Sequence, residues 1–345
     1  MPVPLGVVDI VYAPRPVEER AELALTDAFE HIDVLVDVDP ATLPLPVGCP
    51  TAFPKPRPGW CSTPAPRAGP GMWERTIEWF RAAPGALLDL AQRHPRIDRV
   101  VHLAAQAGVR YSLVNPRAYI SANLTGHLEV LEACRRIERL KHLVFASSSS
   151  VYGGNTRVPF AETDTVDTPQ SLYAATKRAD ELMAYCYAHL FRLPVTGLRF
   201  FTVYGPWGRP DMAAWLFTKA IIEGQPIQLF NYGKMRRDFT YIDDIVAGVV
   251  ACLSMPPVDL PERPPFRLYN LGNHRSEELE HFVSVVERAL GRKTTRELLA
   301  MQPGDVPATF ADIESARRDF GFNPKITVEE GLPRFVAWYR DYHRI

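Results

Sequence analysis

A tyrosine and a lysine four residues apart, Tyr173 and Lys177, open a helical pattern in the middle of this chain. Residues with this spacing lie on one face of a helix, so the lysine ammonium can approach the tyrosine phenol. A nearby positive charge favours the ionised phenol, and a phenolate can remove a proton from a substrate hydroxyl. Ordinary amphipathic helices also carry this spacing, so the pair alone leaves both interpretations open.

Four consecutive serines, residues 147–150, stand directly before Val151, Tyr152 and Gly153. They follow an apolar run, and the segment 142–147 is typical of a buried parallel strand. Ligands of α/β proteins bind at the carboxyl ends of such strands. The serines therefore favour the catalytic interpretation of the tyrosine and the lysine.

Strands and helices that position these side chains alternate after residue 85. Strands are predicted at 99–104, 142–147 and 195–200, and helices at 87–94, 119–136 and 172–191. This alternation predicts an α/β protein with a doubly wound parallel sheet. Both the serine run and Tyr173 then lie where the strands end.

Composition excludes several classes of function. The formal net charge of the 345 residues is -1, which gives no basis for binding nucleic acid or an anionic membrane. No apolar run reaches the roughly 20 residues that span a bilayer. The first residues lack the basic and then apolar pattern of a signal peptide, so none is expected. The five cysteines show neither metal-ligand spacing nor an even count. We therefore expect a cytoplasmic protein with free thiols and no metal.

The first 85 residues have a different composition. Ten prolines fall between Pro40 and Pro70, a density that helices and central strands do not tolerate. The segment 40–71 is therefore expected to be irregular. Before it, weaker patterns predict a strand at 7–12, a helix at 17–31 and a strand at 32–38.

Long stretches of the remaining sequence resemble a known family. They span residues 102–110, 146–153, 172–177, 198–212, 233–244 and 303–309. From about residue 87 onward the chain resembles the extended short-chain dehydrogenase/reductases of the NAD-dependent epimerase/dehydratase family, and within it the UDP-glucuronate 4-epimerases. The resemblance implies a Rossmann-like sheet with a smaller C-terminal substrate lobe.

The implied organisation has three parts. Residues 1–85 form an atypical proline-rich segment, so that the N-terminal part of the sheet is atypical or incomplete. Residues 86–205 form the rest of the NAD-binding domain. Residues 206–345 form mainly the lobe, with segments that return to the sheet. The resemblance also implies a homodimer that forms through the helices following Asn115 and Leu172.

The resemblance implies a reaction and three catalytic residues. Tyr173 would remove the proton of the sugar 4-hydroxyl while hydride passes to NAD, and Lys177 would support the phenolate and hold the nicotinamide ribose. Ser148 would relay protons between Tyr173 and the sugar. The 4-keto sugar would turn and take the hydride back on its other face, which converts UDP-glucuronate to UDP-galacturonate.

Ser149 and Ser150 favour epimerisation over the activities of related enzymes. Relatives that dehydrate the sugar carry Asp-Glu at these two positions, and those that decarboxylate it carry Glu at the second, because both reactions need an extra acid or base. Epimerisation needs no such group.

Further site residues are implied by the same resemblance. The cofactor contacts would come from Leu103, Ala104, Ala105, Asn123, Ser147, Tyr173, Lys177 and Phe201. The substrate contacts would come from Arg110, Ser149, Ser150, Thr202, Arg209, Arg237 and Asp305. Among these, Arg209 would face the uronate carboxylate, Arg237 the nucleotide phosphates and Asp305 the uridine, and arginine suits both anions. Each arginine also has the alternative of a solvated surface charge. Asn123, Phe201 and Thr202 have ordinary structural alternatives.

One family feature is missing. Members begin with a strand and a Gly-x-x-Gly-x-x-Gly loop that seats the cofactor pyrophosphate, and no glycines before residue 80 have this spacing. Asp37 or Asp39 is a weak candidate for the acid that holds the adenosine ribose. Three interpretations follow: a misframed N-terminal segment, a divergent replacement that still binds NAD, or a UDP-sugar-binding pseudoenzyme. We favour the first, because the weak patterns there lack caps and turns. Another NAD-dependent sugar epimerase or dehydratase is also an alternative.

Overall fold

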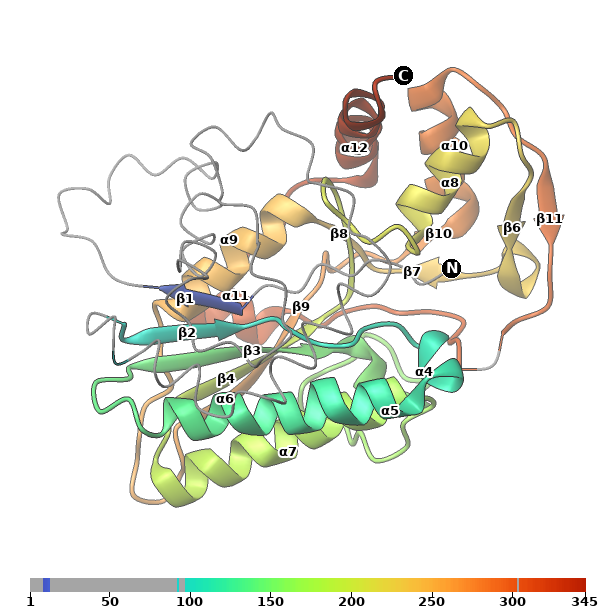
Figure 1. The fold of residues 1–345 in the computed structure, drawn as a ribbon. Helices are drawn as coiled ribbons and strands as arrows, with labels where there is room; N and C mark the ends of the chain where they lie inside the picture. Colours follow the sequence, from blue (N-terminus) through green and yellow to red (C-terminus); the bar gives the residue numbers. More distant parts are fainter. Residues whose placement is uncertain (1–8, 13–91, 93–96, 303) are drawn as a thin grey trace, which may run out of the picture.

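The computed structural model describes residues 9–12, 92, 97–302 and 304–345, and a five-stranded sheet lies at its centre (Figure 1). The order along the sheet is β1-β2-β3-β4-β9. These strands are β1 (Asp9–Tyr12), β2 (Arg99–His102), β3 (His142–Ser148), β4 (Val195–Phe200) and β9 (Phe266–Leu271). The last four are parallel to one another, which confirms the predicted parallel sheet.

Helices cover both faces of this sheet, which makes it doubly wound (Figure 1). On one face lie α6 (Gly126–Cys134) and α7 (Leu172–Phe191), and on the other lie α9 (Ile242–Leu253) and α11 (Glu314–Phe320). Because apolar residues must be buried on both faces, the central strands read as continuous apolar runs. In β3, for example, Leu143, Val144 and Phe145 are all buried.

The predicted boundaries hold closely around α7. The helix over 172–191 and the strand over 195–200 have the expected bounds. Ser171 caps the helix, since its side chain accepts a hydrogen bond from the backbone N–H of Ala174. The predicted strand 99–104 ends two residues earlier, at His102, and the strand 142–147 extends by one residue, to Ser148.

The helix predicted over 119–136 is built from several segments. After α4 (Tyr111–Val114), the helix begins with α5 (Pro116–Tyr119), continues as a π-helical segment η5 (Ile120–Thr125) and ends as α6. A π-helical turn contains more residues than an α-helical turn, which changes the direction of the side chains that follow it. Such turns are frequent at functional sites. It contains Asn123, one of the predicted site residues.

The N-terminal part of the sheet departs from an all-parallel arrangement. The strand predicted at 7–12 is present as β1, and it pairs antiparallel with β2. The other four strands of the sheet are parallel to one another, so this edge is atypical, as expected. The predicted helix 17–31, strand 32–38 and irregular segment 40–71 lie outside the described residues, as does the helix 87–94 apart from residue 92.

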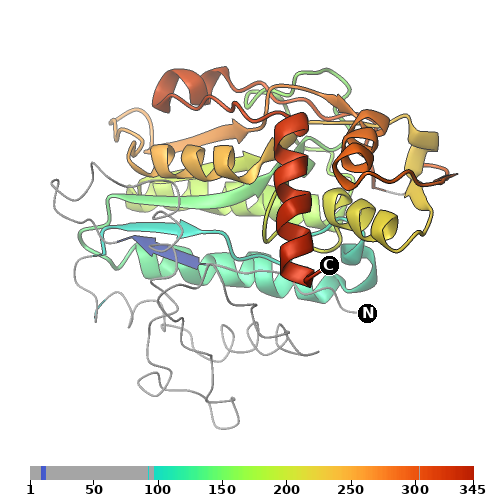
Figure 2. The same ribbon diagram turned by 90° about the horizontal axis from the view of Figure 1, so that it is seen from above.

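A smaller lobe lies beyond the carboxyl ends of the sheet strands (Figures 1 and 2). Its strands pair as β5 (Thr202–Tyr204) with β8 (Phe239–Tyr241), β6 (Ile227–Leu229) with β11 (Arg296–Leu298), and β7 (Arg236–Arg237) with β10 (Glu277–Glu278). The short helix η7 (Phe230–Gly233) follows β6. The longer helices are α8 (Ala213–Ile222), α10 (Leu279–Leu290) and α12 (Val328–His343). They pack around a separate apolar core that includes Phe282 and Phe335.

The described part of the chain contains neither a helix suited to cross a membrane nor a cluster of metal-ligating side chains. None of its helices combines the length and the apolar character needed to cross a bilayer. Its His, Cys, Asp and Glu side chains form no group of three or more that could hold a metal ion.

Candidate functional site

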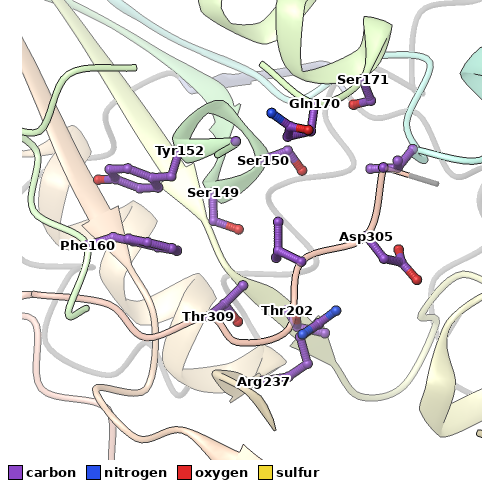
Figure 3. A pocket seen from close by; sticks show the side chains of 14 residues that line it. Ser149, Ser150, Tyr152, Phe160, Gln170, Ser171, Thr202, Arg237, Asp305 and Thr309 are labelled. Carbon is purple, nitrogen blue, oxygen red and sulfur yellow. The ribbon is translucent and has the colours of Figure 1, made fainter. Parts of the chain in front are cut away.

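A pocket opens between the end of β3 and the smaller lobe (Figure 3). Five of the predicted substrate residues line it: Ser149, Ser150, Thr202, Arg237 and Asp305. Figure 3 shows Ser149 and Ser150 on one side and Arg237 on the opposite side. Gln170, Ser171 and Thr309 also line the pocket and were not predicted as site residues.

The four serines divide between two environments. Ser147 lies in strand β3, and its hydroxyl donates a 2.6 Å hydrogen bond to Glu181 on α7. This side chain therefore points to the face of the sheet that α7 covers. Ser148 ends β3, and its hydroxyl accepts a 3.1 Å hydrogen bond from the backbone N–H of Ser150. This bond starts the short helix η6 (Ser149–Tyr152), which carries the next two serines into the pocket wall.

Tyr173 and Lys177 lie in the first two turns of α7. The Lys177 ammonium is buried and donates to the backbone carbonyl of Ala146 at 2.8 Å and to the Asp180 carboxylate at 3.2 Å. The half-buried Tyr173 ring meets the edge of the Tyr119 ring, with 6.1 Å between the centroids. Two of the three ammonium hydrogens are therefore used within the described structure.

Asn123 fastens the segment after β2 to helix α7. Its side-chain amide donates to the carbonyl of Gln106 at 3.1 Å and to the hydroxyl of Thr176 at 2.9 Å, and its oxygen accepts from the backbone N–H of Gln106 at 2.8 Å. The half-buried residues Leu103 and Ala104, with Ala105, belong to the segment that is held in this way. The pattern of apolar residues gave no signal for Gln106 or Thr176.

Arg237 is the arginine that reaches the pocket. Burial lowers the pKa of its guanidinium, while the nearby Asp305 carboxylate opposes this effect. Asp305 also accepts a hydrogen bond from Arg110 at 3.3 Å. The Arg110 guanidinium lies over the Phe230 ring, 4.5 Å from its centroid, and its side chain is half exposed. Arg110 is not among the residues that line the pocket.

Arg209 is held by a neighbouring acid rather than by the pocket wall. Its guanidinium donates two hydrogen bonds to Asp211, at 2.9 and 2.8 Å. The backbone of Gly108 passes close by, since a Cβ atom on Gly108 would lie 3.5 Å from Arg209 Nη2 and 3.6 Å from the Tyr119 hydroxyl. Gly108 has a φ of 108°, which a residue with a Cβ atom rarely adopts.

A buried charge cluster of Glu181, Arg199 and Ser147 lies between α7 and the strands β3 and β4. Glu181 accepts two hydrogen bonds from Arg199 on β4, at 2.8 and 2.9 Å, and one from Ser147. The Arg199 guanidinium lies 4.9 Å from the centroid of the Tyr152 ring. Phe201 belongs to the apolar core beside Tyr152. A charged residue inside the apolar run 195–200 was the one signal in the sequence for this cluster.

The described residues fit the nicotinamide half of a dinucleotide. A buried ammonium with a remaining hydrogen suits ribose hydroxyls, and Tyr173 lies one helical turn away on the same helix. The segment 103–105 follows the carboxyl end of β2, where parallel sheets bind nucleotides. For the pyrophosphate, the sequence before residue 80 offers no Gly-x-x-Gly-x-x-Gly loop.

Comparisons with known proteins agree with this geometry. The model of the NAD dependent epimerase/dehydratase family matches residues 70–272, more than half of the chain. This match begins earlier than residue 87, where the resemblance of the motifs begins. A probable UDP-glucuronate 4-epimerase of Rhizobium meliloti is 49% identical over 271 residues, which cover 75% of this chain and 79% of the relative.

Two further relatives are also named as 4-epimerases of UDP-glucuronate. UDP-glucuronate 4-epimerase 2 of Arabidopsis thaliana is 47% identical over 255 residues, which cover 71% of this chain and 59% of the relative. The crystal structure of UDP-glucuronic acid 4-epimerase from Bacillus cereus, in complex with UDP-glucuronic acid and NAD, aligns with a TM-score of 0.67. Its identity is 33%, and the alignment covers 74% of this chain and 78% of that chain. The chain therefore belongs to the NAD-dependent epimerase/dehydratase family.

Proposed function

We propose that this chain is an NAD-dependent nucleotide-sugar 4-epimerase that interconverts UDP-glucuronate and UDP-galacturonate. The observation that carries the proposal is the wall of the pocket at the end of β3, where Ser149 and Ser150 present neutral hydroxyls opposite Arg237. A pocket with this lining lacks, at these two positions, the acid or base that dehydration or decarboxylation needs. The names of the relatives support the same reaction.

The proposed mechanism uses three residues of this chain. Tyr173 takes the proton of the sugar 4-hydroxyl and later returns it. Ser148 passes the proton between the sugar and Tyr173, and Lys177 supports the phenolate with its charge. A bound NAD would supply the acceptor and donor for the hydride at C4 of the sugar. Lys177, Asn123 and Phe201 would lie near its nicotinamide end, and Leu103, Ala104 and Ala105 would line the path from its adenine to its ribose.

The substrate would lie across the pocket from the sheet to the lobe. Arg237 would bind the nucleotide phosphates, and Asp305 the uridine. Arg209 would exchange Asp211 for the uronate carboxylate, because both acids offer two oxygens to the guanidinium. Ser149, Ser150 and Thr202 would bind sugar hydroxyls. This assigns residues 86–205 mainly to the cofactor and 206–345 mainly to the substrate.

A second function is favoured by one specific observation. The sequence lacks the glycine loop, and β1 runs antiparallel to β2 at the edge of the sheet. A chain that has lost its pyrophosphate site would bind UDP-sugars without turning them over. Such a protein would bind the UDP-sugar in the same pocket but would have no epimerase activity.

We also propose a homodimer in a reducing compartment such as the cytoplasm. Apolar side chains are exposed on the neighbouring helical segments η5, α6 and α7: Ile120, Leu128, Leu182, Tyr185, Leu190 and Phe191. A second copy of the chain would cover them. The described cysteines Cys134, Cys186 and Cys252 are free thiols, which supports a reducing environment.

Substitution of Tyr173 tests the proposed function. The full-length protein should convert UDP-glucuronate to UDP-galacturonate, and Tyr173→Phe should lower kcat by at least roughly 1,000-fold because the base is lost. Calorimetry should find UDP affinity within about threefold of wild type, since the ring stays in place. A kcat of Tyr173→Phe close to that of wild type would disprove the assigned base. UDP binding by wild type without turnover would support the binding protein.

A further inference from the structure

Lys177 has a buried acidic partner that the proposed reaction does not use. Asp180 lies three residues further along α7, and its Oδ2 atom accepts a 3.2 Å hydrogen bond from the Lys177 ammonium. The side chains of the two residues are 1% and 4% exposed, so water screens their charges little. The other oxygen, Asp180 Oδ1, has no hydrogen-bond partner among the described residues.

Charged and titratable groups surround Asp180 from three elements. Lys177 and Glu181 face it from α7, and His102 faces it from β2. His127 on α6 lies near Lys177 and stacks on His102, with 5.4 Å between the rings. Burial holds the pKa of His127 well below its ordinary value, so this ring is neutral. Lys177, Asp180, His102, and Glu181 with its partners Arg199 and Arg178 therefore all contribute to the charge near the end of β3.

The charge of Asp180 persists at neutral pH. Burial raises the pKa of its carboxyl to about 6, with the Lys177 ammonium opposing this rise. Above that pH the carboxylate compensates part of the ammonium charge, and below it the compensation is lost. The helix spacing and the second bond to Ala146 fix where the ammonium lies.

We infer that Asp180 is a positioning residue that holds the Lys177 ammonium in place and sets the pH range over which Tyr173 acts as a base. This inference rests on the proposed function of Tyr173 and Lys177. With Asp180 ionised, Tyr173 experiences only part of the lysine charge. Without it, the full positive charge favours the phenolate, and the base works at lower pH.

The pH profile of turnover tests the inference in the full-length protein with NAD. Asp180→Asn keeps the shape and removes the charge, so the pH below which kcat falls should move down by roughly half a unit or more. Glu314→Gln, the same charge change on an exposed part of α11, should not move it. An unchanged or raised midpoint for Asp180→Asn would overturn the inference. If Asp180→Asn does not fold, Asp180→Ala serves for the same measurement.

A second measurement needs neither cofactor nor activity. Thermal unfolding is compared for Asp180→Asn, Lys177→Met and the double variant. At pH 7.5 the double variant should lose several degrees less in Tm than the sum of the two single losses, because each single variant leaves a buried partner unpaired. At pH 5, where Asp180 takes up a proton, this difference should shrink. Additive losses at both pH values would overturn the inference even if the enzyme proved inactive.

Discussion

The two arginines assigned to the substrate differ in what holds them. Arg237 lies in the pocket wall, and burial lowers the pKa of its guanidinium. Arg209 is engaged by Asp211 two residues away. An arginine that already binds a carboxylate in two hydrogen bonds has the geometry to bind another. At the scale of single residues, we therefore expect Arg209 to determine the preference for a uronate over a neutral sugar.

Substitution of Arg209 measures this preference. Arg209→Met should raise KM for UDP-glucuronate by roughly 10- to 100-fold, because a charge-assisted hydrogen-bonded pair is lost. The affinity for UDP alone should stay within about threefold of wild type. Arg318→Met, which removes an exposed arginine on α11, is the matched control. Equal KM values for wild type and Arg209→Met would rule out the assigned contact.

Helix α7 carries both the proposed catalytic residues and a buried ion pair. One part of the helix carries Tyr173 and Lys177, and the next turn carries Glu181, which binds Arg199 on β4 and Ser147 on β3. These bonds fix the helix against both strands at the level of the site. The cluster therefore aligns helix α7 with the carboxyl ends of strands β3 and β4.

Removal of Glu181 should cost far more than removal of an exposed acid. Glu181→Ala leaves the Arg199 charge buried without its partner, which typically costs about 3–5 kcal/mol of the free energy of unfolding. Glu314→Ala, which breaks the exposed pair with Arg317, should cost about 1 kcal/mol or less. Urea denaturation of the two variants gives the comparison. Equal losses would show that the cluster does not support the fold.

The sequence predicted the central elements well and the lobe poorly. The strand 195–200 and the helix 172–191 were found because long apolar runs and helical spacing are strong signals. The paired strands β6 and β11 are three residues each, too short to show a period. The Arg209–Asp211 pair and the bonds from Asn123 to Gln106 and Thr176 depend on loop and tertiary geometry, which composition and periodicity do not encode.

At the scale of the whole molecule, the two ends of the chain contrast. The described region from residue 97 onward forms a doubly wound sheet and a lobe with separate apolar cores. At the N-terminal edge, β1 pairs antiparallel with β2, and the sequence offers no glycine loop for a pyrophosphate. The proposed 4-epimerase activity therefore requires that the full-length chain bind NAD without this loop.

The proposed homodimer is tested by the mass of the protein in solution. Light scattering should give twice the 38.8 kDa of one chain. Leu182→Glu together with Tyr185→Glu places charges on the exposed apolar surface of α7 and should give a monomer. A wild-type mass of one chain would reject the dimer.

The most direct test of the central claim follows a label at C4 of the sugar. The full-length protein is incubated with UDP-glucuronate that carries deuterium at C4, and the product is analysed by NMR and mass spectrometry. An epimerase that removes the hydride and returns it to the same carbon gives UDP-galacturonate that retains the deuterium. No UDP-galacturonate, or a product that has lost the deuterium to water, would contradict the account.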